Sequence, residues 1–286
     1  MKTILISDIG GKQETIIPYA LNFTKHIDNS ISIIHAVDSR MQHAVSSAYA
    51  DSQSFEVGSK LSYEEILERE KHHTRQTLDK ILSKEASRLN FPLKVNTHVE
   101  ESTIENMLSN ELDADKTSLI IGTSKLEGTI VNDLEDFFET TRKFNSLSLV
   151  VPPEYSFSNP KNALIQFDFN QGINDRIYKV LELLKAFDPL ISVLGATEQD
   201  KHKEMIIKGE AWQKEADNYM KSSLRITTNI LAGSENTNTL LDFIQRNNYD
   251  LVAIPNKMNV STGINFMSRN TSNQLIDKLN IPILLY

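Results

Sequence analysis

The sequence has no cysteine among its 286 residues. Disulfides, thiolate zinc sites, iron–sulfur clusters and cysteine nucleophiles are therefore excluded. Long apolar runs are also missing, since no stretch approaches the ~18 residues of a membrane span. The opening residues 1–5 form a β-like run rather than a charged region that leads into a cleavable signal. We therefore expect a cytoplasmic protein with no membrane partner.

Positive charge is scarce relative to negative charge. The chain carries 30 basic and 38 acidic residues, which gives a formal net charge of −8. No general positive field exists to attract a nucleic acid, so we expect no nucleic-acid partner. The first 153 residues hold most of the excess, with a net charge of −7 against −1 for the remainder. Hydrophobic residues make up 40% of the chain, which is typical of a folded globular protein.

Recognisable catalytic motifs are also missing. The sequence has no Gly-x-Ser-x-Gly elbow, no Walker loop and no Gly-x-Gly-x-x-Gly fingerprint. His72 and His73 are neighbours on an expected helix, where they point about 100° apart and cannot chelate one metal together. Among the other histidines, His202 alone has a glutamate or a histidine four residues away, Glu198, and a single such pair supplies too few ligands for a zinc site. We therefore predict no catalytic residue, no metal site and no enzyme activity.

A segment rich in proline and turn-forming residues, 152–160, divides the chain. We expect one domain at 1–153, a linker at 154–160 and a second domain at 161–286. Both halves show the same alternation of short apolar runs with amphipathic stretches of helical spacing. The expected strands are 3–9, 31–37, 93–99, 118–121 and 147–151 in the first half, and 163–167, 191–196, 224–231, 251–254 and 282–285 in the second. The expected helices are 14–27, 62–89, 102–112 and 133–144, and then 174–187, 203–221, 234–246 and 267–279.

Strands that alternate with helices, several of them apolar throughout, predict parallel sheets covered on both faces. Each half is therefore expected to be a doubly wound α/β domain with a five-stranded parallel sheet. Ligands of such folds bind beyond the carboxyl ends of the strands. Two of the residues at those ends, Asp8 and Ala36, recur 160 positions later as Asp168 and Ala196. Gly122 is expected to correspond to Pro255, because the second half is shorter between its second and third strands.

Four segments together resemble the universal stress protein family, in a tandem arrangement that covers nearly the whole chain. They are Ile-Leu-Ile-Ser-Asp at 4–8, Ser-Ile-Ile-His-Ala-Val-Asp at 32–38, Leu-Ile-Ile-Gly-Thr-Ser at 119–124 and Leu-Val-Val-Pro at 149–152. The resemblance implies two Rossmann-like domains of the adenine nucleotide alpha hydrolase type. In family members that bind ATP, the first-strand aspartate and the backbone after the second strand hold adenosine, and a glycine loop after the fourth strand holds phosphate. This implies a nucleotide site at Asp8, Ala36, Gly122, Thr123 and Ser124.

The glycine loop departs from the family pattern in both halves. Lys125 stands at the second glycine position of the first half and Glu135 at the third, while Pro255 and Met258 replace the first two glycines of the second half. Phosphate binding needs glycine there because backbone N–H groups must approach the oxygens without a Cβ in the way. A carboxylate at the loop also repels a triphosphate.

The resemblance therefore implies a non-enzymatic stress-response or regulatory binding protein that does not depend on ATP and needs no cofactor. Its partner is an unidentified protein or small ligand. The alternative is a protein that binds ATP or AMP, or hydrolyses ATP slowly, through the first domain only. Asp8 and Asp168 also have a simpler interpretation, in which each carboxylate caps the turn that follows its strand.

The closing strands of the two halves are apolar and would be exposed edges if each domain stood alone. We expect 147–151 to pair with 282–285 within one chain, so that the domains form an intrachain pseudo-dimer. Further pairing of two chains into a homodimer remains open.

Overall fold

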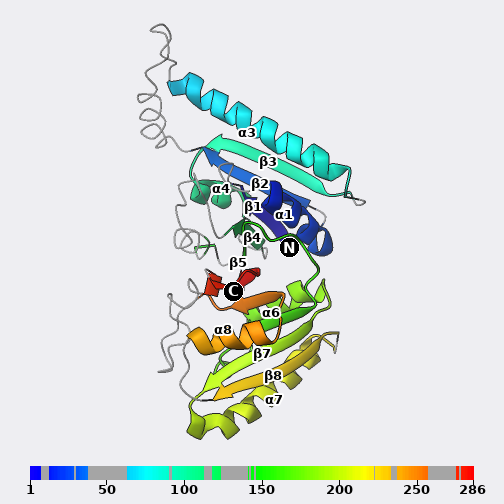
Figure 1. Ribbon diagram of the computed structural model, residues 1–286, viewed down its shortest axis with the longest axis vertical. Coiled ribbons are helices and arrows are strands. Elements are labelled where there is room, and N and C mark those ends of the chain that lie inside the picture. Colours follow the sequence, from blue (N-terminus) through cyan, green and yellow to red (C-terminus); the bar gives the residue numbers. More distant parts are fainter. Residues whose placement is uncertain are drawn as a thin grey trace.

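The computed structural model describes residues 1–7, 13–28, 30–37, 63–89, 92–112, 118–123, 141, 143–144, 146–221, 223–232, 237–256, 275–276 and 278–286. One ten-stranded sheet runs through both halves in the order β3-β2-β1-β4-β5-β10-β9-β6-β7-β8 (Figure 1). The first-half strands are β1 (Lys2–Ile6), β2 (Ser30–Val37), β3 (Lys94–Glu101), β4 (Ser118–Thr123) and β5 (Leu147–Val151). The second-half strands are β6 (Asn162–Gln166), β7 (Leu190–Thr197), β8 (Arg225–Ala232), β9 (Leu251–Ile254) and β10 (Ile283–Leu285).

Each half repeats the same strand order, in which the third strand lies at the outer edge and the fifth at the centre of the molecule. All pairings within a half are parallel. The predicted class, two tandem doubly wound domains with five parallel strands each, is confirmed. The apolar strands predict this arrangement because both of their faces are buried.

Helices cover both faces of the sheet. The described ones are α1 (Gln13–Ile27), α3 (Tyr63–Ala86), α4 (Ile104–Glu111), α6 (Asp175–Lys185), a 3₁₀ turn η2 (Gln199–Lys201), α7 (His202–Tyr219) and α8 (Thr237–Arg246). One hydrophobic core includes residues of α1, α3, α6 and α7. A second core, on the opposite face, includes residues of α4 and α8. The helices expected at 133–144 and 267–279 lie mostly outside the described residues.

The two halves meet at the centre of the sheet, where β5 and β10 run antiparallel. Leu149 lies directly opposite Leu284, and Val150 lies opposite Ile283. All of these side chains are buried. The predicted pairing of the closing strands is therefore confirmed, and neither strand is left as an exposed edge.

The segment between β5 and β6 also contributes to the core. The ring of Phe157 lies 5.5 Å from that of Tyr19 and 6.3 Å from that of Phe23, both on α1. Phe23 in turn lies 4.6 Å from Phe187, which follows α6. This aromatic cluster joins the first helix of each half on one face of the sheet. The connection is therefore a packed element as well as a covalent one.

The strand register fixes which residues of the two halves correspond. In the first half Leu5 pairs with Ile121. In the second half Ile165, 160 positions after Leu5, pairs with Ala253. Ile121 and Ala253 are therefore equivalent, and both belong to the core on the α1 and α6 face.

This equivalence corrects one sequence-based match. Gly122 corresponds to Ile254, and Thr123 corresponds to Pro255, so the expected match of Gly122 with Pro255 is wrong by one residue. The second half still has no glycine at that position. Helix α4 begins two residues later than the expected range 102–112, and its N-cap is Thr103. The Thr103 hydroxyl accepts a hydrogen bond from the Asn106 backbone N–H at 3.2 Å.

Candidate functional site

The candidate site lies at the carboxyl ends of the parallel strands in each half. Because β5 and β10 are antiparallel, the two sets of carboxyl ends face opposite edges of the sheet. Asp8 and Ser124 lie outside the described residues. Ala36 lies in β2, and Gly122 and Thr123 end β4. The structure therefore places three of the five predicted site residues at one edge, in buried strands.

His35 on β2 connects the ends of β1 and β2 in the first half through a contact with the backbone of Ser7. Its Nδ1 lies 2.8 Å from the carbonyl oxygen of Ser7, and the Ser7 N–H donates to the carbonyl of Ile34 at 2.8 Å. Burial lowers the pKa of His35, although the Ser7 hydrogen bond and the charge of Glu70 oppose that shift. The buried imidazole therefore holds the backbone of Ser7 at the end of β1.

Thr123 brings a hydroxyl to the end of β4. The residue is 5% exposed, and its Oγ1 has no hydrogen-bond partner among the residues that the structure describes. Strand alternation places it on the same face as Leu119 and Ile121, beneath α1. Because an unsatisfied buried hydroxyl costs free energy, this position suits a ligand or a water molecule that accepts or donates a hydrogen bond.

Asp168, the second-half counterpart of Asp8, is occupied by its own loop. Its Oδ1 accepts hydrogen bonds from both the backbone N–H and the side-chain amide of Asn170, each at 3.0 Å. Lys208 on α7 donates to the Asn170 side-chain oxygen at 2.8 Å. The carboxylate thus closes the turn after β6, as the simpler interpretation of a loop-end aspartate predicts.

Tyr286 lies across the carboxyl edge of the second half. The residue is only 5% exposed, and its hydroxyl donates to the Gln166 carbonyl at the end of β6. Since β9 lies between β10 and β6, the side chain must pass beneath the end of β9 to reach this acceptor. Burial raises the pKa of Tyr286, and the charge of Asp168 adds to the effect. The crevice beside β9 is therefore filled by the protein itself.

Phe169 fills the neighbouring part of the same edge. A Cβ added to Gly195 on β7 would lie 2.3 Å from the Phe169 ring, so the ring packs directly on the glycine backbone. Phe169 also contacts Trp212 on α7, with ring centroids 5.9 Å apart. The packing of Phe169 on Gly195 was not predicted from the sequence. Its only local signals are the alternating phenylalanines at 167 and 169 and a glycine inside an apolar strand.

The first half has no equivalent of the tyrosine. Leu149 corresponds to Leu284, so the position of Tyr286 is taken by Val151. A valine side chain lacks both the length and the hydroxyl to reach the last carbonyl of β1. The two crevices therefore differ: the second is closed by an aromatic side chain at a position where the first has a small aliphatic one.

Comparison with known proteins gives matches at the level of structure only. No protein-family model matches the chain, and no curated protein is significantly similar to it in sequence. A universal stress protein from Archaeoglobus fulgidus DSM 4304 superimposes with a TM-score of 0.66, over 99% of this chain and 97% of that one, at 12% identity. The chain has the fold of a tandem universal stress protein. The cytoplasmic domain of a prokaryotic cation chloride cotransporter also matches, with a TM-score of 0.55, 8% identity and coverage of 99% and 94%.

Two further observations concern the described part of the chain. Within those ranges, no group of three or more histidine, aspartate or glutamate side chains is close enough together to hold a metal ion. Among the described helices, none combines the length and the apolar composition needed to cross a bilayer.

Proposed function

We propose that this protein is a non-enzymatic regulatory binding protein of the universal stress protein type, cytoplasmic and independent of ATP. Its partner is a protein or a small ligand rather than a nucleic acid or a membrane. The fold alone does not decide this, because one fold can serve unrelated functions. The same architecture occurs in a universal stress protein and in the cytoplasmic domain of a transporter.

The proposal is supported most directly by the crevice at the carboxyl ends of the second-half strands, which the protein's own side chains fill. Tyr286 and Phe169 occupy the carboxyl edge, and the Asp168 carboxylate is held by Asn170. A nucleotide would have to displace two buried aromatic side chains to enter. We therefore assign the second half a structural role, in which it covers the β5 edge of the first.

The first half carries the second candidate function, which is nucleotide binding through one domain only. The hydroxyl of Thr123 and the small side chain of Val151 favour an open crevice there. Against it stand Lys125 and Glu135 at positions where the family pattern has glycine. We infer that the loop no longer binds phosphate and that ATP binding, if retained, is weak.

A thermal shift measurement with Mg-ATP tests both functions. A ligand at a concentration equal to its Kd adds only RT ln 2, or ~0.4 kcal/mol. For a domain of this size 1 kcal/mol corresponds to a change of ~2–4 °C in Tm. We therefore expect a rise of no more than ~1 °C at millimolar Mg-ATP.

A rise of several degrees would contradict ATP independence and favour the second candidate. In that case Asp8→Ala and Thr123→Val should abolish the shift, and Asp168→Ala should preserve it. A shift that Asp168→Ala removes would instead place the nucleotide in the second half and refute the structural role assigned to it. Release of phosphate from Mg-ATP by the wild type, lost in Asp8→Ala, would refute the non-enzymatic assignment.

A further inference from the structure

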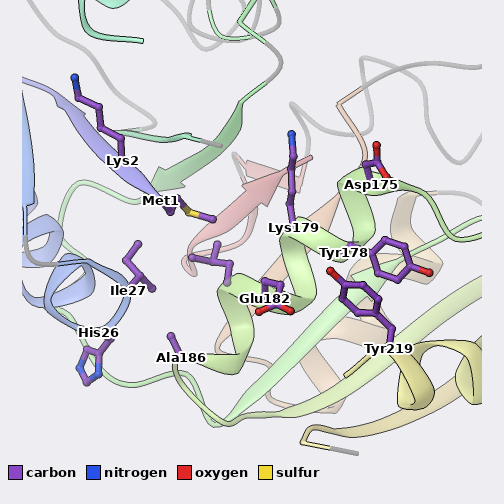
Figure 2. A pocket seen from close by; sticks show the side chains of 11 residues that line it. Met1, Lys2, His26, Ile27, Asp175, Tyr178, Lys179, Glu182, Ala186 and Tyr219 are labelled. Atoms are coloured by element: carbon purple, nitrogen blue, oxygen red, sulfur yellow. The ribbon is translucent and has the colours of Figure 1, made fainter. Parts of the chain in front are cut away.

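A cavity of about 850 Å³ lies between the two halves (Figure 2). On the first-half side, the cavity is lined by Met1 and Lys2 at the start of β1 and by His26 and Ile27 at the end of α1. The second half lines it with one side of α6 and with Tyr219 at the end of α7. Its volume falls in the range of small-molecule sites, which often form between domains. None of Asp168, Phe169 and Tyr286 lines it, so it is separate from the plugged crevice.

The helix α6 places three charged side chains along the cavity. Asp175, Lys179 and Glu182 follow one another at spacings of four and three residues, which puts them on one side of the helix. None of these three side chains has a hydrogen bond or an ion pair to another residue that the structure describes. Lys2, by contrast, is held by Glu111 at 2.7 Å. The α6 side of the cavity therefore presents one available ammonium group and two available carboxylates.

The remaining walls are aromatic and apolar. Tyr178 and Tyr219 stack with their ring centroids 3.8 Å apart, and the Tyr178 hydroxyl donates to Glu215 at 3.3 Å. Tyr219 is 45% exposed, which is unusual for so large a side chain. Ile27 and Ala186 lie on the other side of the cavity (Figure 2). A ligand would therefore find apolar surface on both sides of the charged stripe.

We propose that this cavity binds a short apolar peptide in its zwitterionic form, such as a dipeptide. Its carboxylate would pair with Lys179, and its ammonium group would pair with Glu182. Glu182 and Tyr219 line the same cavity, where an aromatic ring can also attract the ammonium group. The apolar side chains of the peptide would pack on Tyr219 and on the opposite wall.

The spacing of the charges favours a dipeptide over a single amino acid. Lys179 and Glu182 are three residues apart, a rise of about 4.5 Å along the helix. Their side chains diverge, with Lys179 extending away from Glu182 (Figure 2). Two extended residues span up to ~7 Å between their ends. The two charges of a single amino acid lie closer together, so side chains that diverge favour the longer dipeptide.

The test uses the full chain and three forms of leucyl-phenylalanine measured by isothermal titration calorimetry. The free dipeptide has both charges, the N-acetylated form lacks the cation, and the C-amidated form lacks the anion. We expect the free dipeptide to bind and each blocked form to bind at least ~10-fold more weakly, because charge-assisted hydrogen bonds are lost. Equal binding of all three forms, or no binding of the free form at millimolar concentration, overturns the proposal.

Two variants assign the partners. Lys179→Gln should abolish the preference for the free form over the amidated form, and Glu182→Gln should abolish the preference over the acetylated form. Lys185→Gln on α6 and Glu210→Gln on α7 are matched controls, because both residues are exposed and neither lines the cavity. Preferences that survive Lys179→Gln and Glu182→Gln, or that a control variant removes, refute this site. The result does not depend on whether ATP binds.

Discussion

The buried phenol of Tyr286 should make the protein lose stability at alkaline pH. Burial raises its pKa in the folded state, and burial raises the pKa of Tyr19 on α1 in the same way. In the unfolded chain each phenol ionises near its ordinary pKa of ~10. Below that pH both states keep the proton, so the contribution to stability is complete. Above it the unfolded state releases a proton that the folded state retains, and the free energy of unfolding falls.

The size of the effect follows from proton linkage. Each tyrosine that stays protonated only in the folded state lowers the free energy of unfolding by ~1.4 kcal/mol per pH unit above 10. Tyr286 and Tyr19 together should therefore cost ~2.8 kcal/mol at pH 11. Tyr286→Phe keeps the ring that fills the crevice but removes the ionisable group, so the loss at pH 11 should drop to ~1.4 kcal/mol.

Equilibrium urea denaturation between pH 9 and pH 11 measures these slopes. At neutral pH, Tyr286→Phe should cost only ~1 kcal/mol, the net value of one hydrogen bond to the Gln166 carbonyl. Tyr19→Phe should halve the alkaline slope independently, and the double variant should remove most of it. If Tyr286→Phe and the wild type lose stability equally between pH 9 and pH 11, the hydroxyl is not buried and the crevice is not closed.

Two other predictions concern the packing of Phe169 on Gly195 and the pairing of β5 with β10. Gly195→Ala should destabilise the protein by ~1–3 kcal/mol in urea denaturation, because the new Cβ meets the Phe169 ring at 2.3 Å. Gly209→Ala on α7 is the matched control, because the nearest atoms to its new Cβ would be 3.6 Å away. This variant should be as stable as the wild type or more stable. Equal losses of stability in the two variants would show that the contact with Phe169 is not the cause. A fragment of residues 1–154 exposes β5 and should dimerise or aggregate in analytical ultracentrifugation, whereas the full chain should not. A soluble monomeric fragment at tens of micromolar would show that the β5 edge does not need β10.

Sequence patterns were sufficient for the architecture because the information is local. Apolar runs such as Ile4–Ile6 with helices between them fix the parallel sheet, and the exposed apolar edges of the closing strands point to their pairing. His35 lies within the apolar run 31–37, and its burial fits that place.

The contents of the second crevice were not predictable in the same way. The Tyr286 hydroxyl reaches the Gln166 carbonyl past the end of β9, and the two residues lie 120 positions apart in the sequence. No local sequence pattern indicates such a contact. The one-residue error at Gly122 has a related cause. Counting residues between motifs does not show where the second half is shortened relative to the first. Once the strands are paired, the alternation of side chains between the two faces of the sheet fixes which residues of the two halves correspond.

The antiparallel pairing of β5 with β10 joins two halves whose binding crevices can change independently. A symmetric pair of identical subunits carries the same residue on both sides of its axis, so any mutation alters two binding sites at once. Here Leu149 and Leu284 face each other as the two copies of one position, yet each is encoded separately. One crevice therefore has Tyr286, while the other has Val151 at the matching place. Because both halves belong to one chain, a single substitution can close or open one crevice without any change to the other.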